Sequence, residues 1–247
     1  MQIQKLIPNT FTMLNLFSGI LAILCIQNEN FSGGFLFMLA GIGFDFFDGF
    51  FARMFKVTGP LGIQLDSLAD AVTSGLAPGF IMYKLIENTL GTDNTSFFSG
   101  NEFSTSELQS FIPFFGFLLT IAAIYRLAKF NISEDQKHHF IGLPTPANAI
   151  FIAGLALVIT NDQFTLVNYI DTTWFLLIVT LLSCYMMNSK LNLFALKFQS
   201  YDFNTNKVRY LFIATVILIV SLIGINAIPL TIILYILFSL LANIKFK

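Results

Sequence analysis

The sequence contains little charge and few cysteine or histidine residues. Only 11% of its 247 residues are charged, whereas a soluble domain of this size carries about 25%. The net charge of −1 argues against a surface for general nucleic-acid binding. Cys25 and Cys184 fall in apolar stretches that we expect near opposite faces of a membrane. A disulfide between them is therefore not expected, and both are interpreted as small apolar fillers.

Hydrophobic residues take the place of the missing charge. They make up 55% of the chain, and the mean hydropathy is +0.75. We predict an all-α, polytopic integral membrane helical bundle of about eight transmembrane helices in one domain, residues 1–247. The first apolar stretch lacks a small-x-small cleavage site, so we expect a retained helix and not a signal peptide. The eight predicted spans lie near residues 10–27, 33–56, 66–86, 111–130, 145–161, 173–188, 208–224 and 227–244.

Basic residues follow the alternation of these spans. If the chain crosses the membrane eight times, twelve of its 13 lysines and arginines fall on one side. Lys84 alone falls toward the other side, and the connecting segments 87–110 and 161–173 contain no basic residue. The excess of positive charge on cytoplasmic loops predicts that both termini are cytoplasmic.

Four aspartates interrupt the second and third apolar segments. Asp45 and Asp48 are three residues apart, whereas Asp66 and Asp70 are four apart, so each pair occupies one face of its helix. A short connection joins the two segments at the predicted cytoplasmic side. We therefore expect the two pairs to face each other across a hairpin, in a pocket open to the cytoplasm.

Four facing carboxylates require neutralisation. An aspartate at mid-membrane costs about 2.5–3.5 kcal/mol on insertion scales, and Arg53 offsets only one charge. Two divalent cations would offset all four, and hard carboxylate oxygens favour Mg²⁺ or Mn²⁺ over zinc. Gly49 and Gly62, beside the carboxylates, either leave space for a ligand or permit close helix packing.

These residues together resemble a known signature. The pattern Asp45-x2-Asp48-Gly49-x2-Ala52-Arg53-x8-Gly62-x3-Asp66-x3-Asp70 is similar to that of the CDP-alcohol phosphotransferase family. The resemblance implies transfer of a substituted phosphoryl group from a CDP-linked donor to an alcohol, with release of CMP. It also implies a homodimer and a six-helix catalytic core at about 1–190, with two additional helices at about 205–247.

Four further stretches resemble the branch of this family that makes phosphatidylserine. They lie at residues 8–19, 66–79, 126–131 and 142–149. This likeness implies CDP-diacylglycerol as donor and L-serine as acceptor, in a bacterial-type inner membrane with the active site facing the cytoplasm. In the last stretch, Pro144 and Pro146 are expected to fix the turn before a helix.

The resemblance also implies roles for individual residues. All four aspartates are expected to bind metal, and Asp70 is also expected to act as the base for the acceptor hydroxyl. Arg126 and Lys129 are candidates for substrate binding, although the rule for basic residues on cytoplasmic loops explains them as well. Asn9, Thr12 and Asn15 either line the pocket or bond to other helices. The expected substrate-binding residues are Gly49, Ala52, Arg53, Gly62, Arg126, Lys129, Asn15 and Thr12.

Three alternatives remain open from the sequence. One is a relative that makes phosphatidylglycerophosphate or an inositol lipid, because the aspartate pattern does not identify the alcohol. Another is an intramembrane prenyltransferase, which also uses aspartate pairs to hold magnesium diphosphate. The third is an ion-coupled transporter, although the acids cluster toward one face and the two halves show no symmetry.

Overall fold

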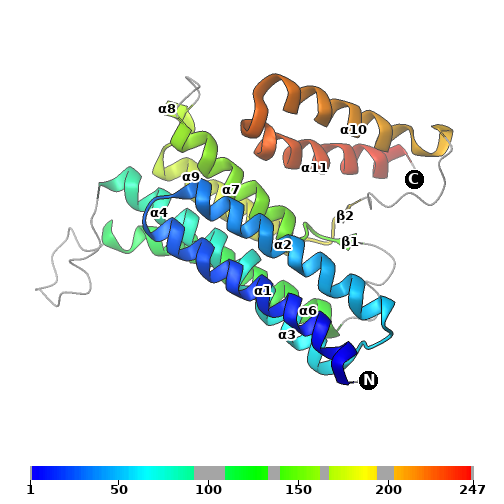
Figure 1. Cartoon of the computed structure of the whole chain (residues 1–247). Coiled ribbons are helices and arrows are strands. Elements are labelled where there is room, and N and C mark those ends of the chain that lie inside the picture. Colours follow the sequence, from blue (N-terminus) through cyan, green and yellow to red (C-terminus); the bar gives the residue numbers. More distant parts are fainter. Residues whose placement is uncertain (1, 92–108, 133–139, 162–166, 194–202, 246–247) are drawn as a thin grey trace, which may run out of the picture.

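Helices occupy all eight predicted positions (Figure 1). The computed structural model describes residues 2–91, 109–132, 140–161, 167–193 and 203–245. The elements are α1 (Gln2–Gln27), α2 (Phe31–Met54), α3 (Pro60–Asp70), η1 (Ala71–Leu76), α4 (Ala77–Leu90), η3 (Ile112–Phe117), α6 (Leu118–Ile132), β1 (Phe140–Ile141), α7 (Thr145–Asn161), α8 (Val167–Ile170), α9 (Thr173–Asn188), β2 (Asn192–Leu193), α10 (Phe203–Ile223), η5 (Gly224–Ala227) and α11 (Ile228–Lys245). The prediction of an all-α bundle is confirmed. Among the described residues, only the two-residue antiparallel pair β1–β2 departs from it.

The helices present an apolar surface to their surroundings. Four segments are long and apolar enough to cross a bilayer: Leu6–Gln27, Phe31–Met54, Ile112–Ile132 and Arg209–Leu241, the last of which joins α10 to α11. The shorter helices α7 and α9 are apolar too. Large side chains such as Ile132 and Trp174 are 84% and 78% exposed. Water cannot favourably surround so much apolar surface, and the protein is an integral membrane protein.

A short connection turns the chain from α2 into α3. Lys56 adopts a left-handed conformation with φ of 54°, and Gly59 is extended. Pro60 then begins α3, where the absence of an N–H costs nothing. The connection brings the end of α2 beside the start of α3, so Asp66 of α3 lies close to Asp45 and Asp48 of α2.

Small residues allow the first helices to approach closely. A Cβ added to Gly41 of α2 would lie 2.7 Å from the Thr73 methyl group and 3.0 Å from Asn15 Oδ1. A Cβ added to Gly116 of η3 would lie 2.5 Å from the backbone nitrogen of Tyr83. Helices α1, α2 and η1 therefore meet with little space between them, which brings side chains of α1 within reach of α3.

The last two helices lie along one edge of the bundle (Figure 1). α11 packs on α7 and β2, and a Cβ on Gly154 of α7 would lie 2.7 Å from Ile228 Cγ2.

Neither cysteine forms a disulfide, as expected.

Candidate functional site

Three carboxylates converge at the hairpin between α2 and α3. One carboxylate oxygen from each of Asp45, Asp48 and Asp66 lies within 4.8 Å of the other two. Asp45 and Asp48 are about one turn apart on α2, and Asp66 comes from the second turn of α3. The predicted facing of the two helices is thus present for three of the four aspartates.

Thr12 of α1 holds one of these carboxylates. Its hydroxyl donates a 2.6 Å hydrogen bond to Asp48 Oδ2. The two residues are only 3% and 6% exposed, so water does not compete strongly for this bond. A short bond to a charged acceptor fixes the orientation of the Asp48 side chain.

Asp70 lies apart from the three converging carboxylates. It is 9% exposed, and its Oδ1 accepts a 3.1 Å hydrogen bond from Asn15 Nδ2. Asn15 is itself held, because its carbonyl accepts a 3.0 Å bond from Thr73 Oγ1. Asp70 is still within electrostatic range of Asp45 and Asp48. The structure therefore divides the four aspartates into a cluster of three and a separate fourth that bonds to Asn15.

The cluster has the properties of a cation site. Asp66 Oδ1 is buried and has no hydrogen-bond partner, which is costly for a carboxylate oxygen. Within the described part of the chain, the one salt bridge joins Lys84 to Glu87, so no basic residue pairs with the cluster. Three carboxylates with hard oxygen donors could hold a divalent metal ion. These observations fit the expected metal site.

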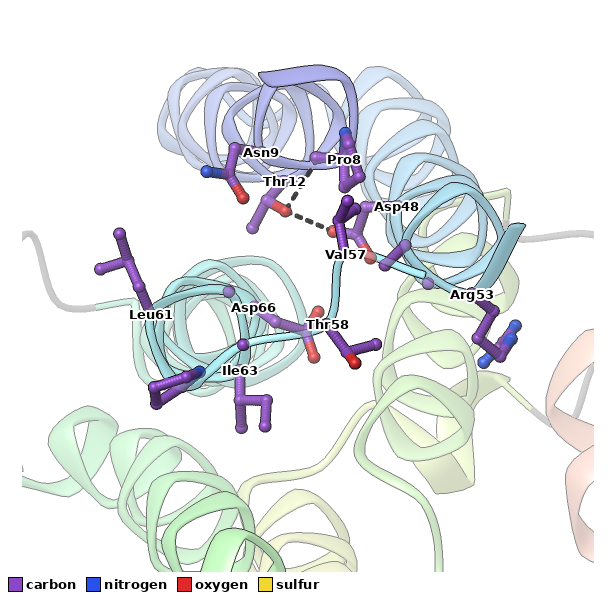
Figure 2. Close-up of a pocket in the computed structure, with 15 residues that line it drawn as sticks. Pro8, Asn9, Thr12, Asp48, Arg53, Val57, Thr58, Leu61, Ile63 and Asp66 are labelled. Atoms are coloured by element: carbon purple, nitrogen blue, oxygen red, sulfur yellow. Dashed lines mark hydrogen bonds between the residues drawn. The ribbon is translucent and has the colours of Figure 1, made fainter. Parts of the chain in front are cut away.

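A pocket of about 350 Å³ opens beside the cluster. Figure 2 shows that residues from the start of α1, the end of α2 and the start of α3 surround it. Asp48 and Asp66 form part of its wall. The other lining residues are Pro8, Asn9, Thr12, Gly49, Ala52, Arg53, Val57, Thr58, Gly59, Pro60, Leu61, Gly62 and Ile63.

Gly49 and Gly62 of the pocket are not packing glycines. A Cβ on Gly49 would meet only the Arg53 guanidinium, at 3.6 Å or more, and one on Gly62 would meet only Asn9 Oδ1, at 4.0 Å. These are ordinary contact distances, unlike the close approach at Gly116. Of the two explanations left open by the sequence, open space for a ligand agrees with the geometry.

Arg53 and the basic residues of α6 occupy different positions. Arg53 lines the pocket and is exposed. Arg126 is half-buried, within electrostatic range of Asp70, and its Nε has no hydrogen-bond partner. Lys129 is exposed. The structure thus brings Arg53 to the pocket and Arg126 to Asp70, and assigns no contact to Lys129.

The predicted residues of α1 are also divided. Asn9 and Thr12 line the pocket, whereas Asn15 is not among the lining residues and bonds to Asp70. The sequence did not predict the contributions of Pro8, of residues 57–59 in the connection, or of Pro60, Leu61 and Ile63 at the start of α3. The glycine and proline of the short connection were the available signal, because a loop that reverses the chain beside a site usually borders it.

Comparison with known proteins agrees with this geometry. The sequence profile of the CDP-alcohol phosphatidyltransferase family matches residues 5–186. CDP-diacylglycerol–serine O-phosphatidyltransferase from Bacillus subtilis is 33% identical over 162 residues, which are 64% of this chain and 76% of that protein. The Helicobacter pylori (strain 26695) protein of the same name is 28% identical over 186 residues, 74% of this chain and 70% of its own.

An archaeal relative bears a different name. Archaetidylserine synthase from Methanothermobacter thermautotrophicus is 28% identical over 156 residues, which are 61% of this chain and 58% of that protein. The family profile covers well over half of the chain and includes every aspartate of the site. The chain belongs to the CDP-alcohol phosphatidyltransferase family.

Proposed function

We propose that this protein transfers the phosphatidyl group of CDP-diacylglycerol to the hydroxyl group of L-serine, giving phosphatidylserine and CMP. The observation that carries the proposal is the cluster of Asp45, Asp48 and Asp66, whose carboxylates lie within 4.8 Å of one another beside a pocket. The names of the bacterial relatives supply the donor and the acceptor.

The four aspartates are proposed to hold two divalent cations, Mg²⁺ or Mn²⁺. The buried, unpartnered Asp66 Oδ1 and the absence of a paired base in the described cluster support this assignment. When bound, such cations would neutralise the donor diphosphate and the negative charge that develops on the leaving CMP. Asp70, apart from the other three, completes the set and has a second role.

Asp70 is proposed as the general base. A carboxylate suits the removal of the serine hydroxyl proton as the serine oxygen attacks the phosphorus of the phosphatidyl group. The new bond joins this oxygen to phosphorus, the bond from phosphorus to the CMP oxygen breaks, and the proton passes to Asp70. The hydrogen bond from Asn15 would keep one Asp70 oxygen engaged, so that the other faces the acceptor.

The pocket is proposed to receive the cytidine diphosphate end of the donor. Gly49, Ala52 and Gly62 leave space for the nucleotide, and Arg53 offers a guanidinium to a phosphate. Thr12 supports the pocket by orienting Asp48. The acyl chains would remain in the bilayer, alongside the exposed apolar faces of the helices.

Arg126 and Lys129 are proposed to bind anionic groups of the substrates. Arg126 is near Asp70, where the acceptor must bind if Asp70 is the base. Lys129 is one turn further along α6 and exposed, which suits a contact with phosphate at the membrane surface.

The setting of the enzyme is proposed from charge and family. The basic residues on one side of the predicted spans support a cytoplasmic active site, in a bacterial-type inner membrane. A catalytic core of about 1–190 is supported by the family match, which ends at residue 186, so α10 and α11 would be additional. We also propose a homodimer, which rests on the family resemblance alone.

The purified protein tests this function directly. We expect CMP release from CDP-diacylglycerol that requires L-serine and a divalent metal, and that stops after EDTA treatment. Glycerol 3-phosphate and inositol phosphate serve as competing acceptors in the same preparation. Activity with one of these and none with serine would reject serine as the acceptor. Full activity after EDTA treatment would reject the metal site.

The base has its own test. Asp70→Asn should bind CDP-diacylglycerol and lose turnover by about two to four powers of ten, the usual contribution of a general base. Near-normal turnover in this variant would remove the assignment.

A further inference from the structure

A second group of buried polar side chains lies on the helices that pack around α6, the helix that carries Arg126. Asn148 of α7 and Ser74 of η1 are each only 1% exposed. Both polar atoms of the Asn148 amide, the Ser74 hydroxyl and Arg126 Nε have no hydrogen-bond partner. Asn188, at the end of α9, has a buried Oδ1 without a partner as well. Native interiors rarely leave so many buried polar atoms unpaired.

The helices that carry these side chains meet around α6. η1 packs against α6, because Thr120 Oγ1 donates a 3.1 Å bond to the Gly75 carbonyl. The end of α9 packs against the same helix, where Asn188 Nδ2 donates a 3.2 Å bond to the Ala122 carbonyl. Arg126 follows Ala122 by one helical turn toward the end of α6. Ser74, Asn188 and Arg126 thus belong to one corner of the bundle.

The segment before α7 forms hydrogen bonds with the end of α9, in the same corner. The Leu143 N–H donates a 2.9 Å bond to the Met186 carbonyl of α9, and Gly142 N–H donates a 2.8 Å bond to the Leu191 carbonyl. α7 also packs against η1 and α6. The hydrogen bonds of Gly142 and Leu143 therefore fix the position of Asn148, which lies in the first turn of α7. The proline-rich stretch, for which only a structural role was expected, positions a polar side chain.

The unpaired atoms include both donors and acceptors. The Asn188 amide donates to the carbonyls of Ala122 and Cys184, which fixes its Oδ1 as the free acceptor. Arg126 Nε–H is a cationic donor that forms no salt bridge with the described carboxylates. The Asn148 amide offers one donor and one acceptor. An amino acid presents the matching groups, because its carboxylate accepts and its ammonium group donates.

We propose that this corner is the subsite that selects an amino-acid acceptor. Arg126 binds the α-carboxylate, Asn148 and Asn188 accept hydrogen bonds from the α-ammonium group, and Ser74 bonds to the carboxylate beside Arg126. The acceptor hydroxyl then faces Asp70, which is within electrostatic range of Arg126. The inference rests on the proposed function and adds the residues that distinguish serine from an alcohol without these two charges.

The test compares acceptors that each lack one charged group. L-serine methyl ester has no carboxylate, and 3-hydroxypropionate has no ammonium group. We expect Arg126→Met to lower kcat/KM for L-serine about 10- to 100-fold and to reduce the preference for serine over its methyl ester toward one. Asn148→Ala should reduce the preference for serine over 3-hydroxypropionate. Neither change should alter KM for CDP-diacylglycerol.

A matched control lies at the other end of α7. Asn161 is exposed and bonds to Asn226 at 3.3 Å, and it follows Asn148 by 13 residues along α7. Asn161→Ala should leave both preferences unchanged. If Asn148→Ala does not fold, Arg126→Met and Ser74→Ala still test the carboxylate side of the subsite through the preference for serine over its methyl ester. Ser74→Ala removes one hydroxyl without creating a large cavity.

The outcomes separate the two proposals. A wild-type enzyme that uses serine, with variants that keep both acceptor preferences, would overturn the subsite and leave the function standing. A wild-type enzyme that does not use serine would overturn the function itself. Variants that lose activity equally with all three acceptors would show a structural role only, and would also overturn the subsite.

Discussion

The hydrogen bond between Asn15 and Asp70 provides the sharpest test of how α1 serves the site. Asn15 Nδ2 lies 3.1 Å from Asp70 Oδ1, and the two residues are 0% and 9% exposed. A buried hydrogen bond to a charged group contributes about 1.5–3 kcal/mol. If this bond holds the base in position for proton removal, its loss would reduce the rate about 10- to 100-fold, at one decade per 1.4 kcal/mol.

The substitution Asn15→Leu removes the donor and keeps a side chain that branches at Cγ. We expect kcat for serine-dependent CMP release to fall by about 10- to 100-fold. KM for CDP-diacylglycerol should change little, because Asn15 does not line the pocket. Thermal stability should fall as well, because Asp70 Oδ1 is left buried without its donor, so kcat is compared per folded enzyme. Steady-state kinetics and thermal unfolding in detergent measure these quantities.

A double-substitution cycle decides whether Asn15 acts through Asp70. In an Asp70→Asn background, adding Asn15→Leu should cause little further loss, because the carboxylate that Asn15 positions is already absent. Full turnover of Asn15→Leu alone would refute the positioning role. Equal losses in both backgrounds would show that Asn15 acts elsewhere.

Three further predictions concern the rest of the bundle. Thr12→Val removes the 2.6 Å bond to the cluster, so the Mg²⁺ concentration for half-maximal activity should rise about tenfold; Thr12→Ser keeps the hydroxyl and should restore it, and an unchanged metal titration would contradict the role. Gly62→Ala should raise KM for CDP-diacylglycerol with little effect on thermal stability, because the added Cβ meets nothing closer than 4.0 Å. Gly116→Ala should leave KM for CDP-diacylglycerol unchanged and lower the free energy of unfolding by about 1–3 kcal/mol, since its Cβ would lie 2.5 Å from the Tyr83 backbone nitrogen. The same effect from both substitutions would refute the distinction between a pocket glycine and a packing glycine. Lys84→Met leaves Glu87 without its 2.7 Å partner, and should cost about 1–3 kcal/mol in thermal unfolding without changing either KM; altered substrate affinity would connect this pair to the site.

The sequence predicted the parts of the fold that depend on local pattern. Apolar runs marked all eight helical positions, because lipid requires a continuous apolar helix wherever the chain crosses. The spacing of Asp45 and Asp48 placed both on one face of α2, and the short connection predicted that Asp66 would face them. These inferences need only helical periodicity and the direction of the chain.

The division of the aspartates was beyond such reasoning. Thr12 reaches Asp48 across 36 residues of sequence, and Asn15 reaches Asp70 across 55. These contacts depend on the rotation of α1 against two other helices, which the small residues at the interfaces determine. Sequence spacing therefore predicted four equivalent carboxylates, whereas the tertiary contacts distinguish a cluster of three from one held by an amide.

The segment from α3 to α4 contributes both to the site and to the core, and a change in its helical geometry explains how. Immediately after Asp70, η1 is a π-helical turn in which the Ala77 N–H bonds to the Val72 carbonyl five residues back. One additional residue in a turn rotates the following side chains by about 100° relative to a continuous α-helix. The aspartates before the turn face α1 and α2, while Gly75 within it and Gly79 after it pack against Ala123 and Thr120 of α6. Because of this turn, the carboxylates and the packing glycines can face different neighbours. A continuous α-helix with 3.6 residues per turn would not produce this change of direction.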